Sequence, residues 1–282
     1  MTAAQRTVPA LLAGKTGAAL GAPERPDLSY ETLAAQGEAV AAQLAGAGIG
    51  PGAPVAIVLP NGPEMAAAFL AVAGCAVAAP LNPAYTADEF AFYMEDLGAR
   101  ALITLAEAET EARPVAERLG VPVLDLVPGE AAGAFWLSQK GTALPSGEAR
   151  FNGPGDVALV LHTSGTTSRP KIVPLTARNI TASAQSIAAT LALTPADRCL
   201  NIMPLFHIHG LIAATLSTMA AGAYIACTPG FNAMRFFGWM EAVRPTWYTA
   251  VPTMHQAILS RAARNSEIIA ATPLRFVRSS SA

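Results

Sequence analysis

The sequence is poor in cysteine, and the few it has do not form a pattern. Cys75, Cys199 and Cys227 are odd in number and far apart in 282 residues. They do not fit a disulfide framework, and their spacing does not suit a zinc site, so we assign no metal ligand. We expect three buried free thiols in a reducing compartment.

Charge and long apolar runs are also scarce. Charged residues make up 13% of the chain and its net charge is −2, which gives no basis for expecting nucleic acid or an anionic membrane as a partner. Although 52% of the residues are apolar, no uninterrupted run has the length of a membrane-spanning helix. Residues 1–20 show no hydrophobic segment with a cleavage site, so we expect no signal peptide and a cytoplasmic location, with the peroxisome as the alternative.

The chain does contain enough apolar sequence for a substantial core. Short apolar runs predict strands at residues 55–59, 76–80, 101–105, 121–126, 157–161, 200–203, 223–227, 247–250 and 274–277. Helical patterns fall between them at residues 29–47, 64–73, 86–97, 111–119, 176–191, 210–221 and 235–243, and again after Pro252. Strands that alternate with helices predict βαβ units and an α/β fold with mostly parallel sheets flanked by helices.

One stretch breaks this alternation. Residues 128–154 hold five glycines and several prolines, which is typical of a loop or linker. We therefore expect a first α/β subdomain over residues 1–127, a linker over 128–155, and a second α/β subdomain over 156–282 that carries the functional loops.

The most informative stretch lies between the strand at 157–161 and the segment 174–179, which is expected to begin a helix. Its small and hydroxyl residues are Thr163, Ser164, Gly165, Thr166 and Thr167, and two cations, Arg169 and Lys171, follow them. Hydroxyls, free backbone N–H groups and a lysine suit a polyphosphate, because each N–H or O–H given to an anionic oxygen makes a charge-assisted bond. The P-loop pattern of nucleotide hydrolases does not fit, since no glycine precedes Lys171 and Ile172 follows it.

Two further polar segments follow predicted strands, where ligands of α/β sheets bind. His207 and His209 lie two residues apart after the strand at 200–203. They lack a third ligand at suitable spacing, so zinc is not expected, and a packed histidine is the alternative to a functional one. Ser279, Ser280 and Ser281 follow Arg278 at the last strand.

The segment 163–171 resembles the phosphate loop of the adenylate-forming (AMP-binding) superfamily, whose members include acyl-CoA synthetases, peptide-synthetase adenylation domains and luciferases. It departs from the usual loop at Ser168 and Ile172, where glycines are common. The resemblance covers essentially the whole chain and implies the N-terminal large domain of such an enzyme. It implies that residues 163–167 and Lys171 bind the phosphates of ATP, with Mg²⁺ assisting, and that His207 contacts the carboxylate being activated. His209 is expected to be structural.

The loop form and the segment 274–282 are most similar to the peroxisomal-type oxalate–CoA ligases. This branch implies a small carboxylic acid, ATP and coenzyme A as substrates, with Ser279 and Ser281 holding the distal carboxylate. Aryl, acyl and malonyl ligases stay open as alternatives. The family's adenine and ribose sites and its small C-terminal domain would come after residue 282, so we expect an N-terminal portion with little activity alone. A non-catalytic protein that binds a nucleotide or a partner is the other alternative.

Overall fold

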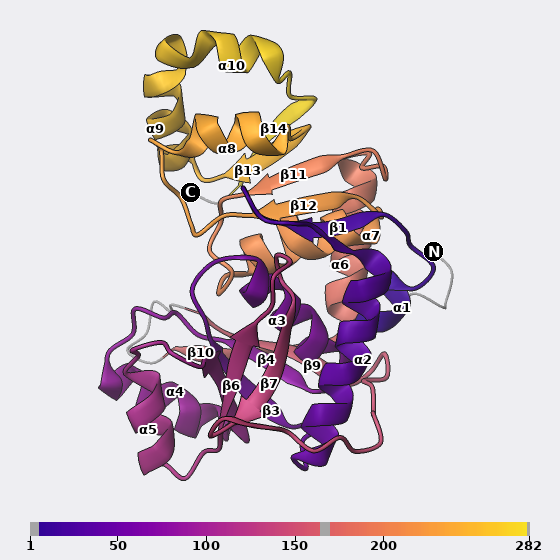
Figure 1. Ribbon diagram of the computed structural model, residues 1–282, viewed down its shortest axis with the longest axis vertical. Helices are drawn as coiled ribbons and strands as arrows, with labels where there is room; N and C mark the ends of the chain where they lie inside the picture. Colours follow the sequence, from indigo (N-terminus) through magenta and orange to yellow (C-terminus); the bar gives the residue numbers. More distant parts are fainter. Residues whose placement is uncertain (1–5, 164–169, 281–282) are drawn as a thin grey trace.

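The computed structural model describes residues 6–163 and 170–280, and their strands form two sheets that lie one above the other in Figure 1. The eight-stranded sheet has the order β10-β9-β4-β3-β5-β6-β7-β8. Its strands are β3 (Pro54–Val58), β4 (Val77–Pro80), β5 (Ala101–Leu105), β6 (Val123–Pro128), β7 (Phe135–Gln139), β8 (Thr142–Ala143), β9 (Val157–Thr163) and β10 (Lys171–Thr176). The strands from β9 to β6 are parallel, and β10, β7 and β8 add antiparallel edges.

The six-stranded sheet has the order β14-β13-β11-β12-β1-β2 and is parallel except at β2. Its strands are β1 (Ala18–Gly21), β2 (Leu28–Ser29), β11 (Arg198–Asn201), β12 (Tyr224–Cys227), β13 (Trp247–Ala250) and β14 (Phe276–Ser279). The predicted α/β class with mostly parallel sheets is therefore confirmed. In this order β12 and β13 lie on opposite sides of β11, so the strand order reverses between β11 and β13, which is where α/β sheets bind ligands.

Thr7, Ser29, Thr86 and Thr176 cap the helices that follow them. The helices are α1 (Val8–Leu12), α2 (Tyr30–Gly46), α3 (Pro63–Cys75), α4 (Ala87–Leu97), α5 (Ala112–Arg118), α6 (Ala177–Thr190), the π-helix η1 (His209–Leu216), α7 (Ser217–Ala220), α8 (Phe236–Val243), α9 (Pro252–Ala262), the 3₁₀ turn η2 (Ala263–Asn265) and α10 (Ser266–Ala271). Thr86 and Glu89 form the predicted capping box of α4, and Gly98 ends that helix with a left-handed φ of 58°.

Three parts of the sequence prediction are wrong. Residues 174–176, which were expected to begin a helix, instead end the edge strand β10, and the helix begins at Ala177. An edge strand tolerates Pro174, because it does not need the missing N–H. The expected loop at 128–155 contains β7 and β8. It also does not separate the sheets, since β9 and β10 beyond it pair in the same sheet as β3. The strands at 18–29 were not predicted, and they join the sheet formed by the C-terminal third.

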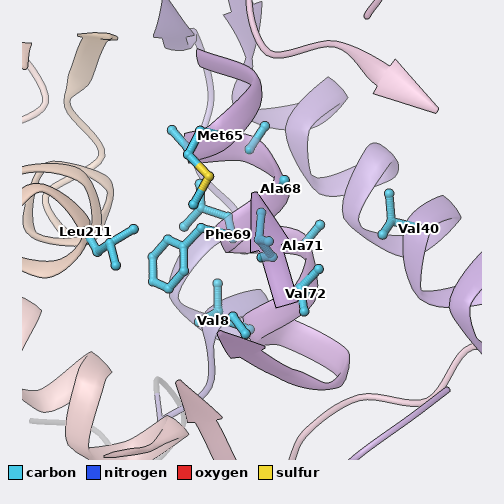
Figure 2. Close-up of a cluster of buried hydrophobic side chains, with 14 of the residues drawn as sticks. Val8, Val40, Met65, Ala68, Phe69, Ala71, Val72 and Leu211 are labelled. Atoms are coloured by element: carbon cyan, nitrogen blue, oxygen red, sulfur yellow. The ribbon is translucent and has the colours of Figure 1, made fainter. Parts of the chain in front are cut away.

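Helix α3 lies between the two sheets and forms the centre of the core (Figure 1). All of its residues except Glu64 are buried, as expected for a helix covered on every side. Figure 2 shows Phe69 of α3 directed toward Leu211 of η1, and both side chains are fully buried. The core therefore connects α3 to the helix that follows the His207 segment. Within the described residues, no helix combines the length and apolar character needed to cross a bilayer.

Candidate functional site

The predicted phosphate loop joins two hydrogen-bonded strands. Thr163 ends β9, Lys171 begins β10, and these two residues are register partners. The pairing fixes Lys171 at the base of the loop. Its side chain is exposed and has no ion-pair partner among the residues that the structure describes. Ser164, Gly165, Thr166 and Thr167 lie outside the described residues, so their assignment stays a prediction.

His162 anchors the strand that leads into this loop. Its Nε2 lies 3.2 Å from an Asp96 carboxylate oxygen, and its ring packs edge-on against Tyr93 with centroids 4.5 Å apart. Desolvation lowers the pKa of His162, opposed by Asp96. The sequence analysis did not single out His162, because both of its partners are on α4, some 66 residues away.

Asn61 joins the two sheets at their carboxyl ends. Its side-chain oxygen accepts a 2.7 Å hydrogen bond from the Leu205 N–H, and its side-chain nitrogen donates to the Thr228 carbonyl at 2.9 Å. Asn61 follows β3, while Leu205 and Thr228 follow β11 and β12. Since β9 is parallel to β3 with only β4 between them, both strands end at the same edge of their sheet. We call this edge, together with the His207 segment that Asn61 ties to it, the junction. This role of Asn61 was not predicted, because Leu205 and Thr228 lie 144 and 167 positions away in the chain.

His207 stands exposed on this junction. Its ring packs beside Phe206 with centroids 4.5 Å apart, and none of the described residues hydrogen-bonds its ring nitrogens. Partial desolvation lowers the pKa of His207, which favours the neutral imidazole at pH 7. A neutral imidazole with an open N–H can donate a hydrogen bond to a carboxylate.

His209 is buried directly behind His207. It is 6% exposed, and its Nε2 lies 2.6 Å from the Thr249 hydroxyl oxygen on β13. Gly210 follows it at a close approach of backbones, where a Cβ would overlap the Pro204 carbonyl oxygen. The π-helix η1 begins here, and π-turns are frequent at functional sites.

Ser279, at the end of the last strand, does not lie on the same face of the sheet as His209. Ser279 is exposed and ends β14, and Ser281 lies outside the described residues. Side chains alternate along a strand, so Ser279 is on the opposite face of β14 from Arg278. Arg278 is the register partner of Thr249, which places Arg278 on the His209 side of the sheet. The structure therefore does not bring Ser279 to the buried side of this site.

Comparison with known proteins identifies the family of this chain. Residues 10–281 match the family model described as AMP-binding enzyme. The chain belongs to this family.

Relatives in the AMP-binding family include CoA ligases. The chain is 44% identical over 241 residues to the oxalate–CoA ligase of Arabidopsis thaliana, covering 84% of this chain and 47% of that protein. It is 30% identical over 260 residues to the sulfoacetate–CoA ligase of Cupriavidus necator, covering 90% and 49%. The ATP-bound structure of MatB from Rhodopseudomonas palustris superposes with a TM-score of 0.82 at 25% identity, covering 99% of this chain and 55% of MatB. The chain thus spans about half the length of the curated relatives that it matches.

The buried histidine gives this AMP-binding chain a defined pH dependence. Burial, and then the charge of Arg278, lowers the pKa of His209 from 6.5 to about 4. Because the unfolded chain takes up the proton first, the stability from neutral His209 is fully present above pH ~6.5 and is lost as pH falls toward 4. We expect this residue to remove about 2 kcal/mol of unfolding free energy between pH 7 and pH 5. Urea unfolding at both pH values should show a smaller change for His209→Asn than for wild type, and equal changes would contradict the assignment.

Proposed function

We propose that this chain carries the ATP- and acid-binding junction of an acid–CoA ligase. In the first step a carboxylate oxygen attacks the α-phosphorus of ATP, and an acyl-adenylate forms as pyrophosphate leaves. In the second step the thiol of coenzyme A attacks the acyl carbon, the thioester forms, and AMP leaves. The proposal is supported by the two hydrogen bonds of Asn61, which tie the end of β3 to the segments after β11 and β12 at the sheet edge where β9 also ends.

The residues at this junction have complementary tasks. Residues 163–167 would hold the β- and γ-phosphates together with Lys171, whose exposed ammonium supplies positive charge. His207 would orient the acid through its open imidazole. Two anions must approach each other in the first step, so catalysis is mostly positioning and charge neutralisation. Mg²⁺ would be held by the ATP phosphates and water; the described residues hold no cluster of three ligands for it, and we assign it no step.

The acid is proposed to be oxalate or another small carboxylate. The two relatives are named for oxalate and sulfoacetate, and both of these acids carry a second negative charge beside the carboxylate that is activated. An apolar tunnel would not hold such a charge, because an unpaired buried charge is very costly. The polar residues near the carboxyl ends of β13 and β14 suit a small dianion better than a fatty acid. Ser281 stays a candidate for contacting the distal group, whereas Ser279 lies on the opposite face of β14 from Arg278.

The second candidate is a non-catalytic protein that binds a nucleotide or a partner. In that case it would bind the triphosphate but release no pyrophosphate.

One assay separates these functions. The ligase function predicts pyrophosphate release with ATP, Mg²⁺ and oxalate, and oxalyl-CoA and AMP after addition of coenzyme A, both measured by chromatography. Acetate and octanoate serve as comparison acids. Release with octanoate but not oxalate would overturn the substrate, and ATP binding without release under any acid would favour the second candidate. Absence of ATP binding would overturn both.

A further inference from the structure

Arg278 is a half-buried cation with no ion-pair partner in the described part of the chain. None of the described residues accepts a hydrogen bond from its guanidinium, and its Nη1 is fully buried. We propose that Arg278, together with His209, binds the second anionic group of a short dianionic acid and so selects dianions over monocarboxylates. This inference rests on the proposed ligase function and names the residues that set its substrate class.

The position of Arg278 follows from strand register. Thr249 and Arg278 are partners on the parallel strands β13 and β14, so their side chains project from the same face of the sheet. On that face His209 approaches from η1 and pairs with the Thr249 hydroxyl at 2.6 Å. These residues lie at the carboxyl ends of the strands, beside the β11/β13 reversal of strand order. This is the place where α/β sheets take ligands.

Two buried hydrogen-bonding atoms are left open here. The Nδ1 of His209 and the Nη1 of Arg278 are buried and have no partner among the described residues. Buried polar groups are normally paired, since an unpaired one carries its full desolvation cost. A carboxylate or sulfonate group could accept from both, because the His209 ring is neutral and can carry its proton on Nδ1 when Thr249 donates to Nε2.

The positive charge of Arg278 is not balanced by the groups around it that the structure describes. Desolvation lowers the pKa of Arg278. A negative charge on the Cys199 thiol would oppose this lowering. Burial raises the pKa of Cys199 well above its ordinary value, so the thiol is neutral and does not balance the guanidinium. The positive charge of Arg278 in turn disfavours the imidazolium form of His209. A bound anion would relieve the cost of an uncompensated charge.

The different exposure of His207 and His209 predicts how a bound acid is oriented. His207 is exposed at the junction and His209 is buried two residues further on. An acid that presents one carboxylate to His207 at the rim would send its other end toward the buried side, where Arg278 lies. A second anionic group there would form an ion pair with the Arg278 guanidinium. A methyl or alkyl end would leave the guanidinium and the imidazole N–H unpaired.

Calorimetric titration tests this assignment with oxalate, acetate and sulfate as probes, with and without ATP. We expect wild type to bind oxalate more tightly than acetate or sulfate, and Arg278→Gln to weaken oxalate about 10- to 100-fold while changing acetate less than about twofold. Arg278→Lys should give an intermediate loss because it keeps the charge but not the planar fork. Arg264→Gln, an exposed arginine in η2, is the matched control and should bind oxalate like wild type.

The outcomes distinguish this inference from the ligase function. Equal losses for oxalate and acetate, or wild-type binding of sulfate as tight as oxalate, would overturn the selection of dianionic acids. If ATP still binds and acids still release pyrophosphate in that case, the ligase function stands. If Arg278→Gln does not fold, by its circular dichroism, His209→Asn provides the test and should also weaken oxalate more than acetate.

Discussion

Replacing Lys171 with methionine should weaken binding of ATP and of inorganic tripolyphosphate about 100-fold. The lysine stands at the base of the predicted phosphate loop, where pairing of Thr163 with Lys171 holds it. Its ammonium has no ion-pair partner in the described parts of the chain, so no folded-state contact is lost with it. The variant loses one charge-assisted contact to a phosphate and the attraction of the ammonium for a highly charged ligand. Together these losses account for a change of that size. Calorimetric titration of both probes measures it.

Lys140 offers a matched control for this experiment. It is an exposed lysine between β7 and β8, at the far edge of the same sheet from β10. Lys140→Met removes the same charge from the molecule and should change tripolyphosphate binding less than about twofold at moderate salt. If Lys140→Met and Lys171→Met weakened binding equally, the effect would come from net charge, and the phosphate-binding role of Lys171 would fail. Unchanged affinity in Lys171→Met would have the same consequence.

Local signals in the sequence predicted the individual elements well. Thr86 and Glu89 predicted the start of α4, and Ser29 predicted that of α2, because caps act within one helical turn. The apolar run at 247–250 predicted a strand, and Trp247 of this strand is fully buried against Phe276. Such features depend on neighbours in the chain and can therefore be recognised without a structure.

Contacts between distant segments could not be predicted in this way. The pairing of β1 with β12 joins residues some two hundred positions apart, and the apolar pattern of a strand does not specify its partner. Asn61 and His162 have the same limitation, since their significance comes from Leu205 and Asp96. Arg278 looked like the end of a strand, and only its register with Thr249 shows that it lies on the His209 face. Sequence motifs thus located the polar segments, while the structure showed the long-range contacts of Asn61 and His162 and the register of Arg278.

Truncation of Phe69 to alanine should cost about 3–5 kcal/mol of unfolding free energy, because it removes a large side chain from a closed core. Phe69 is fully buried in α3, the helix between the two sheets, and it is directed toward Leu211 of η1 (Figure 2). The cavity left by the ring would lie between α3 and η1. Urea unfolding at pH 7 gives the free energy, and a loss below about 1 kcal/mol would show that this contact does not hold the core together.

Phe151 is a matched control for Phe69, because it is also a phenylalanine but its side chain is 43% exposed. Phe151→Ala should lose less than about 1 kcal/mol, because truncation of an exposed ring leaves no closed cavity. The Phe69 change should also reach the functional site, as η1 begins at His209 and its start is packed by Leu211. We therefore expect the variant, where it remains folded, to bind oxalate more weakly than wild type while it binds tripolyphosphate normally, since β9 and β10 pair independently of η1. Equal weakening of both ligands would mean that the two sheets lose their order together and that η1 does not respond on its own.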